Sequence, residues 1–526
     1  MVPRTGILDL PTEILVYVLD NPSLSTSTLY SVALSCRRLH FLALQIYFHR
    51  YGLTPTSKSI VIDMRSDRRD VLAALQTALF IPQTEVITFV FPHPSCTSIS
   101  PLLRHLTRAE DYISRLPSVK HVTLCLDGRG SVCLSVGDDR ELRAWTTRLE
   151  SLLACIVKKQ CECLTMINGG QFTRAYELVP PIPRRSPIKR LLSTVLGLQL
   201  QRRIPSETQD FRRVSKQGRT HIEMTLPTSL HPASRLSILE IHSAILVLPP
   251  GLCWTLTVLR TCPITSLKLE RRVEDSIPWG TVLPLIGSAA GRLTSLTLVE
   301  ASLISGGDTD SFSEADVLDF ISRLPQLRHI TVSYKNRKDL RESDGPLIHL
   351  QDLEILRAPS TFILHLLRSP SPLPNIQSIC VLWPETYDAR GISYLATALP
   401  AFLQKPDPPR LSVSVSSAMY RSPFLTFPTD DTRAFLDRVE GLEITSSPFP
   451  LTDLTEMAGW ISLFPRVRQV EVALSDSKSP DFRSDLTCLL GAVKATDFLD
   501  KIKVNGELYN LLDDRPIPTS SRTRYT

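Results

Sequence analysis

The sequence predicts an α/β protein in which a short N-terminal helical module precedes a solenoid of strand–helix units with a row of parallel strands. Three observations support this prediction. Apolar residues in the first 50 positions recur at helical spacing. Further along, a short framed motif recurs, mostly every 23–31 residues. Proline is abundant, with 40 residues, and glycine is scarce, with 21, which indicates a chain divided into many short elements.

Residues 7–48 are expected to form three short helices. Asp9 can cap the first helix, and Pro11 is tolerated in its first turn because the early helical N–H groups are unpaired. The Ser and Thr residues at 25–27 can cap the second helix, and the third runs from about Cys36 to Phe48. A unit of this size is expected to lean on a partner or on the segment that follows it.

A motif within this module carries a family resemblance. It reads Leu10-Pro11-x-Glu13-Ile14-Leu15-x-x-Val18-Leu19, then Leu29, Leu34 and Ser35-Cys36-Arg37-Arg38-Leu39. The pattern resembles the F-box motif. The resemblance implies a small helical bundle that binds a Skp-type adaptor, which links it to a cullin–RING ubiquitin ligase. Carried over position by position, the implied adaptor contacts are Leu10, Pro11, Ile14, Leu15 and Leu39.

Two positions depart from the family pattern. The second helix of an F-box usually opens with an acidic residue, whereas this sequence offers Ser and Thr. The third helix often carries a Trp near the position of His40 and Phe41. The alternative interpretation of the module is a helical cap that covers the first unit of the solenoid.

The repeats are framed by Leu-Pro. Residues 115–124 and 323–332 share a frame of Arg-Leu-Pro, an apolar residue, a basic residue, His, a β-branched residue, Thr and an apolar residue. Looser copies begin at Leu373 and Phe464. Because proline cannot continue a helix interior, each Leu-Pro or Phe-Pro is expected to end a helix and lead into a strand.

Further strand-like segments fill the intervals between these frames. They are Leu236–Ile241, Ile264–Leu269, Leu293–Leu298, Leu350–Leu356, Leu411–Val415 and Val439–Ile444. Amphipathic helices are expected between them, one opened by a capping box at Ser313–Asp316 and others at 362–367, 391–403, 432–439 and 454–464. Earlier units place strands at 60–64, 86–91, 119–126 and 163–167, with helices at 72–79, 102–116 and 142–157.

Stacking such units would bury a continuous core, with parallel strands along one side. The pattern resembles irregular leucine-rich repeats, although the Asn of the usual ladder motif is absent. The predicted fold is therefore an N-terminal three-helix F-box followed by a leucine-rich-repeat-like α/β solenoid with a parallel strand row. The alternative is an α/β sheet domain whose strands happen to follow helices.

The expected organisation has five parts. Residues 1–50 form the helical module and 58–171 the first repeat-like units. Residues 172–235 are a Pro/Arg-rich insertion or linker, 236–510 the main solenoid, and 511–526 a flexible tail.

The insertion concentrates positive charge. The segment from Arg184 to Arg219 contains ten Lys or Arg residues and two acidic residues, in a chain whose net charge is +6. A nuclear-localisation or acidic-partner patch and a solvated loop both fit this composition. Nucleic-acid binding is disfavoured because no aromatic residues or known fold motif accompany the charge.

Few residues suggest chemistry of their own. Cys161-x-Cys163 is either half a metal site or a pair of core thiols. The run Ser305–Asp310 is either a cation loop or a tight turn. Walker, Rossmann, G-x-S-x-G and H-E-x-x-H patterns do not occur, so no catalytic, cofactor or metal residues are assigned.

The remaining composition favours an intracellular protein. The eleven cysteines have no framework spacing, no signal-peptide pattern opens the sequence, and no 18-residue apolar stretch predicts a membrane span. The expected location is the cytoplasm, the nucleus or both. The expected function is the substrate-recognition subunit of a cullin–RING ubiquitin ligase, with no enzymatic activity and no cofactor. The alternatives are a free-standing repeat scaffold without a ligase link, and an enzyme whose site the sequence does not reveal.

Overall fold

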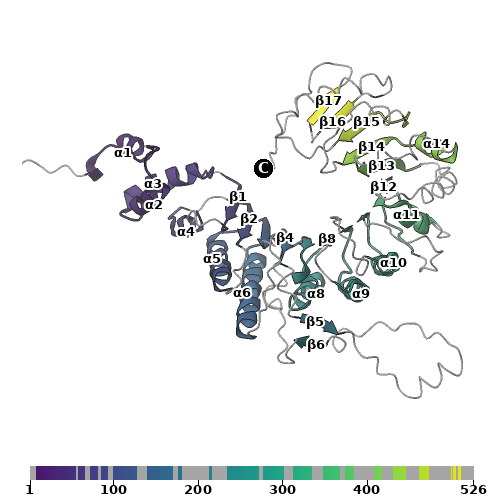
Figure 1. Cartoon of the computed structure of the whole chain (residues 1–526), viewed down its shortest axis with the longest axis horizontal. Helices are drawn as coiled ribbons and strands as arrows, with labels where there is room; N and C mark the ends of the chain where they lie inside the picture. Colours follow the sequence, from purple (N-terminus) through teal and green to yellow (C-terminus); the bar gives the residue numbers. More distant parts are fainter. Residues whose placement is uncertain are drawn as a thin grey trace, which may run out of the picture. The chain divides into compact units, whose positions relative to one another are not determined.

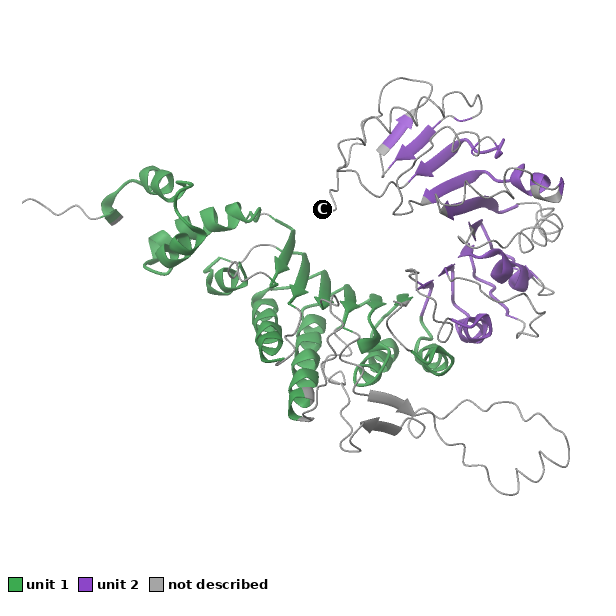
Figure 2. Cartoon of the chain, in the orientation of Figure 1, with its two compact units in different colours: residues 1–292 green, residues 293–526 purple. Residues whose placement is uncertain are grey.

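The computed structural model describes residues 7–54, 57–65, 71–80, 84–92, 99–126, 139–169, 176–179, 212–215, 234–271, 277–300, 312–333, 348–367, 373–383, 408–416, 430–445, 461, 463–472, 499, 501–504 and 507–510 (Figure 1). The chain divides into two compact units, residues 1–292 and residues 293–526 (Figure 2).

The N-terminal module of unit 1 contains the three predicted helices, α1 (Thr12–Leu19), α2 (Thr26–Ala33) and α3 (Arg37–Arg50). Ser25 caps α2 as expected, because its side chain accepts a hydrogen bond from the Thr28 N–H. The expected Asp9 cap is wrong. Asp9 ends a separate 3-10 helix, η1 (Ile7–Asp9), and the N-cap position of α1 is Pro11.

Six strands of unit 1 form a parallel row in chain order. They are β1 (Ser59–Asp63), β2 (Val86–Phe91), β3 (His121–Leu126), β4 (Cys163–Asn168), β7 (Ile238–His242) and β8 (Ser266–Arg271). Between and after them lie α4 (Val71–Thr77), α5 (Ser100–Arg115), α6 (Asp139–Lys158), α8 (Leu252–Thr261) and α9 (Trp279–Ala289). In Figure 1, α5, α6 and α8 lie on one side of the row. The opposite side of the strands is called the open face below.

Unit 2 repeats this arrangement. Its parallel strands, again in chain order, are β9 (Ser295–Glu300), β10 (His329–Ser333), β11 (Ile355–Ala358), β12 (Ser378–Trp383), β13 (Arg410–Ser416), β14 (Gly441–Thr445), β15 (Gln469–Val472) and β16 (Lys501–Val504). The last strand, β17 (Glu507–Asn510), pairs with β16 in the antiparallel sense. The described helices are α10 (Glu314–Ser322), α11 (Ser360–Leu367) and α14 (Asp430–Leu436).

The strand order decides between the two predicted architectures. A doubly wound α/β sheet reverses its strand order at a switch point, whereas a solenoid adds each strand beside the previous one. Within each unit the parallel strands follow the chain without reversal. The predicted solenoid is therefore confirmed, and the sheet-domain alternative is wrong.

The Leu-Pro frame has the predicted role. Helix α5 ends at Arg115, Pro117 follows, and β3 begins at His121; α10 and β10 are joined by the same frame around Pro325. The apolar residue that opens each frame is buried ahead of the strand rather than inside it. These residues are Leu236, Ile264, Leu293, Leu324, Leu350, Leu373, Val439 and Phe464. At α10, Ser313 occupies the N-cap, but its side chain makes no cap hydrogen bond, so the expected capping box is not formed.

Some elements differ from the prediction. The insertion contains an antiparallel pair, β5 (Tyr176–Val179) and β6 (Arg212–Ser215), where the sequence suggested only a linker or loop. Helices α8 and α9 were not predicted, and Pro284 lies inside α9. The predicted helix at 391–403, most of that at 454–464, the Ser305–Asp310 run and the tail lie outside the described residues.

Candidate functional site

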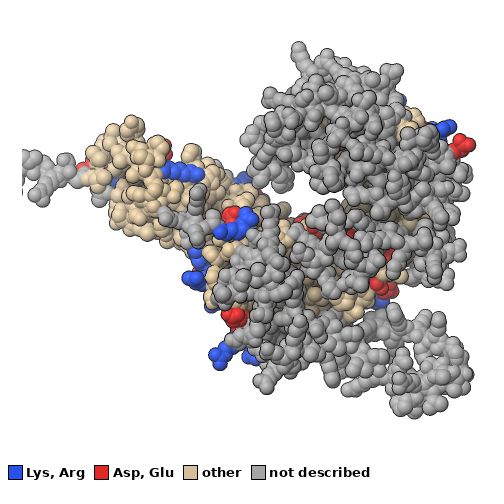
Figure 3. Space-filling model, viewed as in Figure 1, with Lys and Arg blue, Asp and Glu red and all other residues tan. Residues whose placement is uncertain are grey.

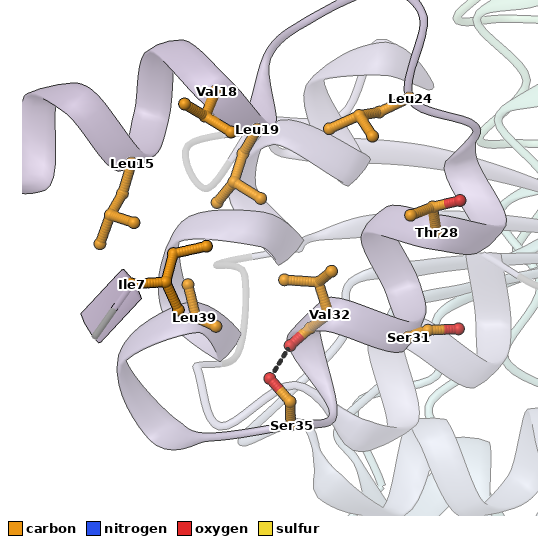
Figure 4. A pocket seen from close by; sticks show the side chains of 10 residues that line it. All are labelled: Ile7, Leu15, Val18, Leu19, Leu24, Thr28, Ser31, Val32, Ser35 and Leu39. Atoms are coloured by element: carbon orange, nitrogen blue, oxygen red, sulfur yellow. Dashed lines mark hydrogen bonds between the residues drawn. The ribbon is translucent and has the colours of Figure 1, made fainter. Parts of the chain in front are cut away.

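The N-terminal module carries an apolar groove. It has a volume of about 420 Å³ and lies between α1 and the α2–α3 pair. In Figure 4, Ile7, Leu15 and Leu39 converge at one end of it, and the Ser35 hydroxyl donates to the Val32 carbonyl at 2.7 Å. The groove is lined by Ile7, Leu15, Val18, Leu19, Leu24, Thr28, Ser31, Val32, Ser35 and Leu39.

The N-terminal module also exposes several large apolar side chains. Tyr17 is 82% exposed, Ile7 60% and Leu34 57%, and the apolar side chains of Leu10, Ile14, Val16 and Val18 are also exposed. Figure 3 shows mostly uncharged, tan atoms over this module. A cluster of large exposed apolar side chains of this kind marks a surface that is covered by a binding partner. We call η1, α1, the Leu10-Pro11 link between them and Leu34 the apolar surface.

The structure divides the five implied adaptor contacts into two groups. Leu10, Pro11 and Ile14 are exposed and belong to the apolar surface. Leu15 and Leu39 are 1% and 8% exposed, so they hold the helices together and reach only the groove floor. The motif thus contains both core and surface positions. Helical geometry explains the division, because consecutive residues of a helix point about 100° apart.

Two arginines hold the chain around α1, and the sequence analysis assigned neither a role. Arg38 donates through Nη2 to the Leu10 carbonyl at 2.8 Å and to Thr12 Oγ1 at 3.2 Å. Arg50 donates to the carbonyls of Leu24 and Asn21 in the turn after α1. Charged donors on backbone carbonyls are stronger than neutral ones, so these contacts fix the position of η1 and α1.

The module is joined to the first strand–helix unit through His40. The ring lies buried, with Nδ1 3.0 Å from the Ala33 carbonyl, and Nε2 accepts a hydrogen bond from the Leu79 N–H at 3.1 Å. Because Nε2 accepts, Nδ1 carries the proton and donates to Ala33. Phe41 and Phe48 contact Phe80 beside this bridge. The module therefore also covers the end of the first strand–helix unit, as the alternative interpretation of a helical cap expected. This contact is separate from the groove and involves the same helices.

Replacing His40 with Ala is expected to destabilise the chain by about 1–3 kcal/mol, because it removes the partners of the buried Ala33 carbonyl and of the part-buried Leu79 N–H. Urea-induced unfolding measures the loss. Hydrogen exchange of the segment 71–80 localises it, since the Leu79 N–H should lose protection. His49→Ala, an exposed position on α3, is the matched control. An unchanged Leu79 exchange rate would contradict the bridge.

The paired cysteines lie in the core at the start of β4. Cys161 and Cys163 are both buried, and among the described residues no group of three or more His, Cys, Asp or Glu side chains could hold a metal ion. Burial raises the pKa of Cys161 to about 12 and that of Cys163 to about 11. They are core thiols on the β4 segment.

Iodoacetamide at pH 8 should therefore modify Cys161 far more slowly in the folded chain than in urea. Raising a thiol pKa from 9 to about 12 lowers the thiolate fraction at pH 8 by roughly a thousandfold, and the thiolate is the reactive form. Peptide mass spectrometry after timed quenching measures the rate at each cysteine. Equal rates for Cys161 in buffer and in urea would show that the thiol is accessible and β4 misplaced.

Comparison with known proteins bears on the N-terminal module. Residues 7–51 match the F-box-like family model. The chain carries an F-box-like domain. The matched residues coincide with η1 and α1–α3, so the F-box-like domain holds both the groove and the apolar surface.

The repeats were compared with solved structures. One similar structure is the leucine-rich repeat-containing protein LegL7 from Legionella pneumophila, at 13% sequence identity and a TM-score of 0.28, over 48% of this chain and 70% of that one. No curated protein matches the chain. None of the described helices is long and apolar enough to cross a membrane.

Proposed function

We propose that this chain is the substrate-recognition subunit of a cullin–RING ubiquitin ligase. The F-box-like domain would bind a Skp-type adaptor, and the repeats would bind the target protein. The proposal rests mainly on one observation, the apolar surface of η1 and α1 inside the F-box-like domain. F-box domains generally bind Skp-type adaptors, which makes such an adaptor the expected cover for this surface.

The proposed chemistry lies outside this chain. A receptor that holds a target beside a ubiquitin-charged enzyme raises the effective concentration of the target, and the bond is formed elsewhere. The coupling of the F-box-like domain to the first unit through His40 suits this role, because it limits how far the first unit swings from the adaptor. A ligase of this type would act in the cytoplasm, the nucleus or both.

The test is co-purification of the tagged full chain with a Skp-type adaptor after joint expression. Leu10→Ala together with Pro11→Ala should abolish adaptor recovery, since both residues are exposed at the start of the apolar surface. Thermal unfolding of the variant should match the parent chain. Unchanged adaptor recovery would leave the free-standing scaffold as the better account.

A further inference from the structure

The open face of unit 1 has a sharp change in character between β4 and β7. The strand register places the residues of this face in rungs that run across the strands. Neighbouring residues within a rung lie on adjacent strands, which are about 4.8 Å apart. One rung consists of Val61, Thr88, Thr123, Thr165, Glu240 and Lys268. The next rung begins with Asp63, Val90, Cys125, Ile167 and His242. In these two rungs the face from β2 to β4 consists of Thr, Val, Cys and Ile, and the rung before them adds Val86, the exposed His121 and Cys163.

Charge gathers at β7 and β8. His242 donates through Nδ1 to Glu270 Oε2 at 2.7 Å, and its Nε2 lies 3.9 Å from Glu240 Oε2. Thr165 donates to the same Glu240 oxygen at 3.0 Å. Lys268 lies 3.9 Å from Glu270. We call Glu240, His242 and Glu270 the acidic cluster.

Within the part of the chain that the structure describes, Glu240 forms no ion pair with a Lys or Arg, although its side chain is only one-third exposed. By contrast, the Asp63 carboxylate on the same face is paired with Arg65 at 2.7 Å. A half-buried carboxylate without a cation has a large electrostatic gain available from a positively charged partner.

The imidazole of His242 supplies a second, independent observation. Its side chain is 10% exposed, and Nε2 is shielded from solvent and has no hydrogen-bond partner among the described residues. Nε2 faces the Glu240 carboxylate at 3.9 Å, which is too long for a hydrogen bond. A buried polar atom without a hydrogen-bond partner is unfavourable, whether it is a donor or an acceptor. A cationic N–H donor from a partner would pair with the Glu240 carboxylate that lies beside this nitrogen.

We infer that the open face of unit 1 binds a segment of the target protein in which a Lys or Arg side chain is flanked by small apolar residues. The cation pairs with Glu240 of the acidic cluster. The flanking residues contact the Thr, Val, Cys and Ile side chains on the open face of β2–β4. Six strands span roughly 24 Å, which an extended segment of about seven residues would cross. The inference rests on the proposed function, because it names the chemical class of the target.

Two pools of twelve-residue fluorescent peptides provide the probe. Both pools have Ala, Val and Thr randomised in the flanks; one carries Lys or Arg at a central position, and the other carries Gln. Fluorescence polarisation with the full chain should show about tenfold or tighter binding of the cationic pool. Glu240→Gln, which keeps the shape and the Thr165 contact, should bind both pools equally. Glu110→Gln on α5, which loses a carboxylate on the helical side, should keep the preference.

A charge-reversal variant distinguishes a lost ion pair from misfolding. Glu240→Lys should prefer a third pool that carries Glu at the central position, a gain that misfolding cannot produce. Equal binding of the first two pools by the parent chain, or an unchanged preference in Glu240→Gln, would overturn the inference. Adaptor binding of the same preparations is measured in parallel. Adaptor binding without peptide preference overturns this inference alone, and peptide preference without adaptor binding overturns the ligase proposal alone.

Discussion

Replacing Ile14 with Asp is expected to abolish adaptor binding and leave the chain folded. Ile14 is 48% exposed in the middle of the apolar surface, so the free chain tolerates a charge there. In a complex, the carboxylate would be buried without a partner, which costs several kcal/mol and weakens binding by a hundredfold or more. Isothermal titration of the variant with a purified Skp-type adaptor measures the loss, and thermal unfolding verifies the fold.

His49→Asp is the control, because it adds the same charge at an exposed position of α3. Its adaptor affinity should stay within a few-fold of the parent. Leu15→Ala provides the contrast, since Leu15 is buried and its loss should act through stability. Full-strength adaptor binding by the Ile14→Asp variant would exclude α1 from the docking surface.

The second large effect is expected in the core of unit 2. Leu327→Ala should lower the free energy of unfolding by about 2–5 kcal/mol, as for buried leucines generally. Leu327 is fully buried two residues before β10, where the frame passes from helix to strand. Urea denaturation of the full chain, followed for the transition of unit 2, measures the change.

Its neighbour gives a close control. Gln326→Ala alters an exposed residue of the same turn and should change the unfolding free energy by less than about 0.5 kcal/mol. A Leu327→Ala variant as stable as the parent would show that the frame faces solvent and that the register of β10 is wrong.

Much of the fold could be predicted because Leu-Pro or Phe-Pro pairs recur between the helices and the strands of the repeats. Leu-Pro frames marked where helices end, and β2 was predicted with its observed bounds, Val86–Phe91. The misses have local causes. Helix α8 follows the Pro249-Pro250-Gly251 run, and α9 contains Pro284, so both looked like loops. The strand pair β5–β6 spans an insertion whose charge and proline content hid it.

The candidate sites were harder to predict. The F-box-like motif located the docking module, but a motif does not separate the exposed Ile14 from the buried Leu15. The acidic cluster joins residues from β7 and β8 with Thr165 of β4, and Thr165 and Glu240 are 75 positions apart in the sequence. Only the strand register brings such residues together, and a single sequence contains no direct signal of register between distant strands.

Direct titration of the purified full chain with a purified Skp-type adaptor tests the central claim. We expect a saturable 1:1 complex, with a negative heat-capacity change because the apolar surface becomes buried. The same stoichiometry should appear in size-exclusion chromatography with light scattering. The absence of a complex at adaptor concentrations up to about 100 μM would contradict the account. It would mean that the binding free energy is weaker than roughly −5.5 kcal/mol.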